Sequence, residues 1–240
     1  MQAQNPPPDV RSTDLAFFLD LDGTLAPIVD DPDKAAVPPE TLAVLSRLVE
    51  TTQGAVAIVS GRALDEVDRM LHPMVLNVAG SHGAEMRGGG TAATAGRIPT
   101  ETVRRVQAFG KQHSLLVEPK AGAVALHYRS APDLGPECRA LIDEVAQSDP
   151  ALRAMHGKMV SEVALKSHSK GTAIEVFLAT QAFMNRLPVM VGDDVTDEDG
   201  FTMAQQHGGF GIKVGEGDTV ARYQVSSLED LRSWLAATLS

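Results

Sequence analysis

The chain has 240 residues, of which 43% are hydrophobic, and it carries a formal net charge of −10 with a single cysteine, Cys138. This size and composition fit a globular protein with one large domain or a core plus a small one, and they exclude an internal disulfide or a thiolate zinc cluster. The negative charge argues against nucleic acid or an anionic membrane as partner, because phosphate groups are bound by clustered Lys and Arg, and no apolar stretch approaches the ~20 residues of a membrane span.

The chain begins with MQAQNPPP, which has neither the basic n-region nor the apolar h-region of a secretory signal. The triple proline predicts a disordered tail over residues 1–14. We therefore expect a cytoplasmic protein. The sequence leaves the oligomeric state open, and a monomer is compatible with it.

Residues 16–79 alternate between strand and helix patterns. Short apolar runs at 16–20, 55–59 and 75–79 predict three strands. Between them, leucines and valines near helical spacing predict helices over 39–51 and 63–71. This βαβαβ order is typical of a parallel sheet with helices on its faces.

The middle of the chain has a different pattern. Glycines at 88–90 and 96 predict a turn-rich loop or hairpin. Predicted helices over 100–113 and 133–147 are each followed by a pair of alternating strands, at 115–120 and 123–129 and at 152–156 and 158–165. Two such αββ units predict a separate small α+β layer, because antiparallel hairpins do not belong to a parallel sheet.

The parallel pattern resumes after residue 166, with predicted helices at 170–180, 196–207 and 228–239 and strands at 188–191 and 208–214. The sequence therefore predicts an α/β fold. Its core is a doubly wound parallel sheet formed by residues 15–99 and 167–240, and a small α+β cap domain of two αββ units is inserted at 100–166.

Two acidic clusters each follow a predicted strand: Asp20-Leu21-Asp22-Gly23-Thr24 and Gly192-Asp193-Asp194-Val195-Thr196-Asp197. Open α/β sheets bind ligands at the carboxyl ends of their strands, and carboxylate oxygens are ligands that hard divalent cations prefer. The two clusters therefore predict one shared metal site. By itself, the first cluster would fit a turn with a helix cap equally well.

The residue types at these strand ends suit phosphoryl transfer. Asp20 can be nucleophile and metal ligand at once, because a cation between it and a phosphoryl group cancels their repulsion. Asp22 can protonate the leaving alkoxide and then activate water, and Gly23 permits a turn that brings backbone N–H groups toward the anion.

Two further groups favour a phosphate ligand. Ser60, in Ser60-Gly61-Arg62, can donate to a phosphoryl oxygen, although a helix N-cap would explain an isolated Ser as well. Lys170 stands at the start of a predicted helix, where the helix dipole disfavours a cation, so a bound anion explains it better. Asp193 would complete the metal site, with Asp197 in support.

Taken in order, these four elements resemble the haloacid dehalogenase superfamily of aspartate-nucleophile phosphotransferases, with a cap inserted between the second and third. Longer strings are similar to the trehalose-6-phosphate phosphatase family, from about residue 15 to the C-terminus. They are FLDLDGTL at 18–25, SGR at 60–62, GSHGAE at 80–85, VEPK at 117–120, LHYR at 126–129, GK at 157–158 with Glu162, SKG at 169–171 and GDDVTDE at 192–198.

The resemblance implies Mg²⁺-dependent hydrolysis of trehalose 6-phosphate through an aspartyl-phosphate intermediate. It makes Asp20 the nucleophile, Asp22 the acid/base, and Ser60 and Lys170 the phosphate contacts. The implied Mg²⁺ ligands are Asp20, Asp22 through its carbonyl, and Asp193, supported by Asp194 and Asp197. The other implied substrate-binding residues are Gly23, Thr24, Arg62, His82, Glu118, Lys120, Arg129, Lys158 and Glu162.

The inserted layer supplies the charged residues that could select a sugar. Glu118 and Lys120 lie two apart on an alternating strand and share a face, as do His127 with Arg129 and Lys158 with Glu162. Cross-strand ion pairing would explain these charges as well as sugar binding does. We expect the layer to be a mobile lid that chooses the sugar while the core performs the chemistry.

One position departs from the family pattern. Members usually carry Lys or Arg two residues after the cap glutamate and then Pro, where this chain has Ala164 and Leu165. Lys166 is the neighbouring charge that the sequence offers in their place.

Other functions remain open from the sequence alone. A phosphatase acting on sucrose phosphate or mannosylglycerate phosphate would share the core motifs, and only the cap strings discriminate it. A receiver-type signalling domain has a parallel sheet with clustered aspartates and a lysine, but its phosphorylated Asp lies on a later strand and no cap is inserted. A binding module without catalysis would not require Asp20, Asp22, Lys170 and Asp193 together.

Overall fold

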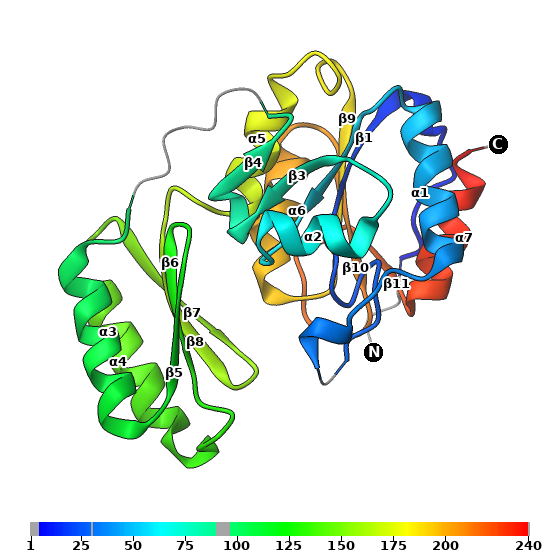
Figure 1. The fold of residues 1–240 in the computed structure, drawn as a ribbon. Coiled ribbons are helices and arrows are strands. Elements are labelled where there is room, and N and C mark those ends of the chain that lie inside the picture. The colour runs from blue at the N-terminus through cyan, green and yellow to red at the C-terminus, as the bar shows by residue number, and fades with distance from the viewer. Residues whose placement is uncertain (1–4, 30, 90–96, 240) are drawn as a thin grey trace. The chain divides into compact units, whose positions relative to one another are not determined.

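The computed structural model describes residues 5–29, 31–89 and 97–239 (Figure 1). It divides into two compact units, Met1–Ala92 with Ser169–Ser240, and Ala93–His168. The second unit contains the segment 100–166 that the sequence predicts as an insertion. Among the described residues, no helix is long and apolar enough to cross a membrane.

The first unit is built on a seven-stranded sheet in the order β11-β10-β9-β1-β2-β3-β4, and its pairs are parallel except for β3 with β4. β1 and β2 are completely buried, as expected for strands covered on both faces. The predicted doubly wound sheet is therefore confirmed. Its strands are β1 (Leu15–Leu19), β2 (Val56–Val59), β3 (Asn77–Gly80), β4 (Glu85–Arg87), β9 (Leu187–Gly192), β10 (Phe210–Val214) and β11 (Tyr223–Val225).

Helices cover both faces of this sheet because alternate residues of β1 point in opposite directions. Phe17 faces α1 (Pro39–Thr51), α2 (Leu64–Leu71) and α7 (Leu228–Ala237). Phe18 faces α5 (Lys170–Leu178) and α6 (Glu198–Gln206), and its ring stacks on Phe183 with centroids 5.3 Å apart. Two apolar layers thus bury the central strands on both faces.

The second unit is a four-stranded antiparallel sheet in the order β5-β6-β8-β7 with two helices. Val124 and Val163 on one face of the sheet pack with Val106 and Ile142 of the helices, which leaves the other face for polar residues. The chain order αββαββ is the one that the sequence predicts. The elements are α3 (Thr100–His113), β5 (Leu116–Lys120), β6 (Ala123–His127), α4 (Gly135–Gln147), β7 (Leu152–Gly157) and β8 (Val160–Leu165).

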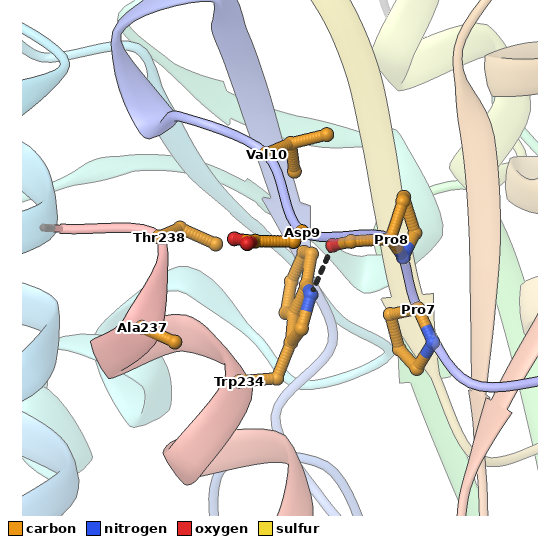
Figure 2. A pocket seen from close by; sticks show the side chains of 7 residues that line it. All are labelled: Pro7, Pro8, Asp9, Val10, Trp234, Ala237 and Thr238. Atoms are coloured by element: carbon orange, nitrogen blue, oxygen red, sulfur yellow. Dashed lines mark hydrogen bonds between the residues drawn. The ribbon is translucent and has the colours of Figure 1, made fainter.

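The N-terminal segment differs from the predicted disordered tail. Residues 1–4 lie outside the described residues, but residues 5–14 belong to the first unit and include a 3-10 helix, Ser12–Asp14, with Ser12 buried. Trp234 of α7 donates from Nε1 to the Pro8 carbonyl at 2.9 Å (Figure 2). The half-buried indole needs an acceptor, and a proline-rich backbone without internal hydrogen bonds offers its carbonyls for that purpose.

The short elements were not predicted. β4 and β11 have three residues each, and four further 3-10 helices occur at Pro32–Lys34, Ser81–Gly83, Pro132–Leu134 and Val195–Asp197. The predicted helix over 196–207 therefore begins as a 3-10 turn. Most of the predicted glycine-rich loop at 88–96 lies outside the described residues.

Candidate active site

The two acidic clusters meet because β1 pairs with β9. Leu19 lies beside Val191 in the parallel register, and the Asp20 amide donates to the Val191 carbonyl at 2.9 Å. β1 and β9 are neighbouring strands (Figure 1). Asp20 and Asp193 follow them at their carboxyl ends. The meeting of the clusters that the sequence predicts is a direct result of this register.

A buried ion network links the two clusters. The Lys170 Nζ donates to Asp20 Oδ1 and to Asp197 Oδ1, each at 2.6 Å. These residues are 3%, 5% and 0% exposed, respectively. The Asp194 amide donates to the second Asp197 oxygen at 2.9 Å, whereas Asp20 Oδ2 accepts a long bond, 3.4 Å, from the Thr24 hydroxyl.

Lys170 is held by the way its helix begins. Ser169 is the N-cap of α5: its hydroxyl accepts from the Thr172 amide at 3.1 Å, and the Thr172 hydroxyl accepts from the Ser169 amide at 2.9 Å. This reciprocal capping satisfies two backbone donors. It places Lys170 as the first helical residue, so its direction is set by backbone geometry.

The electrostatics of the network show an excess of negative charge. Burial raises the pKa of Asp20 well above its usual range despite Lys170, and the charge of Asp197 raises it further. Burial, Asp197 and Asp194 raise the pKa of Asp193 to about 6. Burial would lower the pKa of Lys170, but Asp20 and Asp197 outweigh it and raise that pKa. The cluster therefore suits a further cation.

The donor set fits a hard divalent ion. Asp20, Asp193 and Asp197 each offer an oxygen, and these three atoms lie within 4.8 Å of one another. A Cβ on Gly23 would overlap the Asp193 carboxylate, so only glycine allows this close approach. A site with only carboxylate and carbonyl oxygens suits Mg²⁺ better than softer metals. Both Asp197 oxygens already accept hydrogen bonds, one from Lys170 and one from the Asp194 amide.

Asp22 lies in a separate ion pair. Arg62 donates to it twice, from Nε at 2.6 Å and from Nη2 at 2.8 Å, and also contacts Glu66 at 3.4 Å. The Asp22 side chain is 38% exposed and that of Arg62 11%. This bidentate geometry fixes the carboxylate plane, so Arg62 orients the predicted acid/base group.

Ser60 and His82 lie at the carboxyl ends of β2 and β3. Ser60 is buried, and its hydroxyl accepts from the Arg62 amide at 3.2 Å. The His82 ring packs on Gly61, where an added Cβ would be 2.8 Å from the ring. Ser60, Arg62 and His82 are therefore brought together.

Near the second cluster, Asp194 has a different position from the one predicted, and Lys213 was not predicted as a site residue. Asp194 is exposed, and its carboxylate caps the turn after β9 by accepting from the Val195 amide at 2.7 Å, so Asp194 joins the buried network through its amide and not through its side chain. Lys213 of β10 was missed: it is buried, and its Nζ donates to the Asp193 carbonyl. A lone lysine within the apolar string FGIKV was the available signal.

The polar face of the second unit carries three of the predicted sugar contacts. Glu118, Ala125 and Glu162 lie in one row across β5, β6 and β8. Lys120 Nζ donates to Glu162 Oε1 at 2.8 Å and lies 3.9 Å from Glu118. Glu162 is 8% exposed, and its Oε2 has no hydrogen-bond partner among the described residues. Cross-strand ion pairing therefore accounts for the Lys120–Glu162 contact. It does not account for the buried Oε2 of Glu162, which accepts no hydrogen bond among the described residues.

Arg129 and Lys158 are not placed on that face by the strand pattern. β6 ends at His127, so Arg129 follows it, and Lys158 lies in the turn between β7 and β8. Both residues are exposed. The prediction that they share a sheet face assumed that the strands extend to these residues, and they do not.

The charge beside Ala164 comes from a residue that the sequence did not indicate. Lys166 donates to the Pro150 carbonyl at 2.8 Å and is exposed. Backbone pairing of β7 with β8 instead puts Arg153 opposite Ala164. Arg153 therefore lies on the same sheet face as Glu162, and its Nη2 donates to the His168 carbonyl at 2.9 Å.

Comparison with known proteins places this site in context. The model of the family described as trehalose-phosphatase matches residues 18–231. The chain is 36% identical over 231 residues to trehalose-6-phosphate phosphatase of Escherichia coli (strain K12), covering 93% of this chain and 86% of that protein.

Solved structures agree in fold. The C-terminal domain of C. albicans trehalose-6-phosphate phosphatase has a TM-score of 0.80 at 22% identity, covering 95% of this chain and 92% of that one. A haloacid dehalogenase-like hydrolase from B. subtilis has a TM-score of 0.68 at 13% identity, covering 93% and 98%. At such identities the likeness shows the fold alone.

Proposed function

This chain belongs to the trehalose-phosphatase family, and on that premise we propose that it hydrolyses trehalose 6-phosphate to trehalose and phosphate. The observation that carries the proposal is the buried Asp20–Lys170–Asp197 network beside Asp193. A carboxylate nucleophile, a fixed ammonium group and a second acid at one sheet edge are what phosphoryl transfer to an aspartate requires. A receiver-type domain is no longer a candidate, because the family model spans nearly the whole chain.

The chemistry follows from which oxygens are engaged. Lys170 holds Asp20 Oδ1, so Oδ2 is the atom that attacks phosphorus. The new bond joins Asp20 to phosphorus as the bond from phosphorus to the sugar oxygen breaks, and Asp22 gives its proton to that oxygen. Asp22 then takes a proton from water, which attacks the aspartyl phosphate and releases inorganic phosphate and free Asp20.

We propose Mg²⁺ as the cofactor. Asp20, Asp193 and the Asp22 carbonyl would hold it, and Asp197 would support them through Lys170 and the Asp194 amide. When bound, the ion offsets the repulsion between the Asp20 carboxylate and the phosphoryl group. Ser60 and Lys170 would hold the phosphoryl oxygens, with Gly23, Thr24, Arg62 and His82 around them.

The proposed function is tested by phosphate release from a panel of sugar phosphates. We expect turnover of trehalose 6-phosphate to exceed that of sucrose phosphate and mannosylglycerate phosphate, to vanish with EDTA and to return with Mg²⁺. Equal turnover of all three sugars would contradict the assigned substrate. Activity that persists in EDTA after dialysis would contradict the metal.

We propose that the polar face of the second unit recognises the sugar, because the core groups can bind only phosphate and metal. Glu118, Lys120 and Glu162 are the residues that we assign to this role, with Arg153 beside them. The buried Oε2 of Glu162 supports the assignment, because a buried carboxylate oxygen without a donor is costly unless a ligand supplies one.

Replacing Glu162 by Ala should lower kcat/KM for trehalose 6-phosphate by on the order of 10²-fold, as expected when hydrogen bonds to a bound substrate are lost. An aryl phosphate has no sugar hydroxyls, so its kcat/KM should barely change. The control is Glu144→Ala, which removes another carboxylate of the same unit, one that pairs with Arg105 at 2.8 Å. A proportional loss for both substrates in folded Glu162→Ala would show that Glu162 does not select the sugar.

A further inference from the structure

Three consecutive residues after β3 have left-handed backbone. Ser81, His82 and Gly83 have φ of 48°, 56° and 96°. Two of them are not glycine, and L-residues rarely adopt this region. Such strain persists only where surrounding structure enforces it, and it gathers at functional sites.

The turn is bonded to the Ser60-Gly61-Arg62 segment on one side. The His82 amide donates to the Ser60 carbonyl at 3.0 Å, and the Ser81 amide donates to the Arg62 carbonyl at 2.7 Å. These two bonds bracket Gly61, on which the His82 ring packs. The left-handed backbone is what lets successive amides of the turn reach both carbonyls.

On its other side the turn meets the start of α5. A Cβ on Gly83 would lie 3.1 Å from the Ser169 carbonyl oxygen and 3.3 Å from the Ala173 Cβ. Ser169 is the N-cap that directly precedes Lys170. One short turn therefore touches the segments that carry both assigned phosphate contacts, Ser60 and Lys170.

The side chain of Glu85, which has no role in the proposed mechanism, is hydrogen-bonded to this turn. Glu85, on β4, is half-buried, and its Oε2 accepts from the Ser81 hydroxyl at 3.3 Å and from the Leu64 amide at 2.9 Å. Leu64 is the first residue of α2, just after the Ser60-Gly61-Arg62 segment. Glu85 thus ties the turn to the end of the same segment that its backbone bonds hold.

We propose that Glu85 is a positioning residue for the phosphoryl site. By holding the Ser81–Gly83 turn, it sets the separation of Ser60 and Lys170 without touching the substrate. The inference rests on the proposed function only in that these two residues bind phosphate. Displacements of about 1 Å in such groups can cost 10²-fold, so a loosened turn should weaken phosphate binding.

The test uses inorganic phosphate, titrated calorimetrically into the Mg²⁺-loaded protein. Glu85→Ala should raise the phosphate Kd about 10-fold or more, because the bond from Ser81 of the turn and the bond from the Leu64 amide are both lost. Glu85→Gln should stay within about 3-fold of the parent, since the amide oxygen still accepts a bond. The Kd of Mg²⁺ measured without phosphate should be unchanged, because the Glu85 bonds go to Ser81 and Leu64 and none among the described residues joins it to the acid cluster.

Asp68→Ala is the matched control. Asp68 joins the same two elements, α2 and β4, through a bidentate pair with Arg87 at 2.6 and 2.7 Å. Among the described residues, Asp68 has no hydrogen bond to Ser81 or Leu64. It should lower the unfolding temperature and leave the phosphate Kd unchanged. This separates loss of stability from loss of positioning.

Two results would overturn the proposal: a folded Glu85→Ala protein that binds phosphate like the parent, or an equal rise in the Kd of phosphate and of Mg²⁺. If Glu85→Ala does not fold, Ser81→Ala decides, because it keeps the bond from Leu64 to Glu85; an unchanged phosphate Kd there overturns the proposal. The probe contains no sugar, so a different sugar specificity would leave this test unaffected.

Discussion

Replacing Asp20 by Asn should abolish hydrolysis of trehalose 6-phosphate, with a loss of at least about 10⁴-fold in kcat, as for removal of other catalytic nucleophiles. The amide can still accept the hydrogen bond from Lys170, but it cannot form the acyl phosphate. In metal-free buffer the variant should unfold at a temperature no lower than the parent's. The reason is that it removes one of three clustered carboxylates, Asp20, Asp193 and Asp197. Phosphate release and calorimetric unfolding measure the two effects.

Asp22→Asn is the matched control for this prediction. It removes a carboxylate two residues away, outside the buried network, and leaves the nucleophile intact. In a single turnover it should still form the aspartyl phosphate from an aryl phosphate, whose leaving group needs no proton. Appreciable steady-state turnover by folded Asp20→Asn would refute covalent catalysis through Asp20.

Replacing Lys170 by Met should destabilise the protein by about 3–5 kcal/mol, the cost of leaving buried charges without their partner. The ammonium group bonds both Asp20 and Asp197, and all three residues are buried. Activity should fall as well, because the group assigned to the phosphoryl oxygens is gone. Urea unfolding at neutral pH gives the free energy.

Lys213→Met tests whether any buried lysine at this sheet edge would behave alike. Lys213 bonds a main-chain carbonyl, that of Asp193, and has no ion pair among the described residues. Its loss should therefore cost clearly less than the loss of Lys170. Equal destabilisation by the two changes would mean that the pairing of Lys170 with Asp20 and Asp197 is not what stabilises the edge.

The core of the fold and the centre of the site could be predicted, because both follow from the hydrophobic periodicity and from the order of strands and helices along the chain. Strand runs alternating with amphipathic helices require a parallel sheet, and carboxyl ends of neighbouring parallel strands share one edge. Asp20 and Asp193 had to meet once β1 and β9 paired. Lys170 was identified because a cation at a helix start contradicts the helix dipole.

What could not be predicted depends on register and on short elements. Arg153 lies opposite Ala164 only because β7 and β8 pair in one particular register, which the sequence does not display. β4 is too short and polar to show a period, so the sequence predicts no strand at Glu85. Residues 5–14 are ordered in part through the hydrogen bond from Trp234 to the Pro8 carbonyl. This contact joins residues that are far apart in the sequence, so the local pattern does not show it.

The first unit is assembled from two stretches of chain, and this affects how it folds during synthesis on the ribosome. The strand LAFFL, β1, pairs with β2 on one side and with β9 on the other, and β9 is made only after the whole second unit. Until then an apolar strand edge is exposed to other nascent chains, the kind of edge that pairs promiscuously. Domains fold as units during synthesis. The second unit can therefore fold before β9 has been made, and until then β1 lacks its pairing with β9.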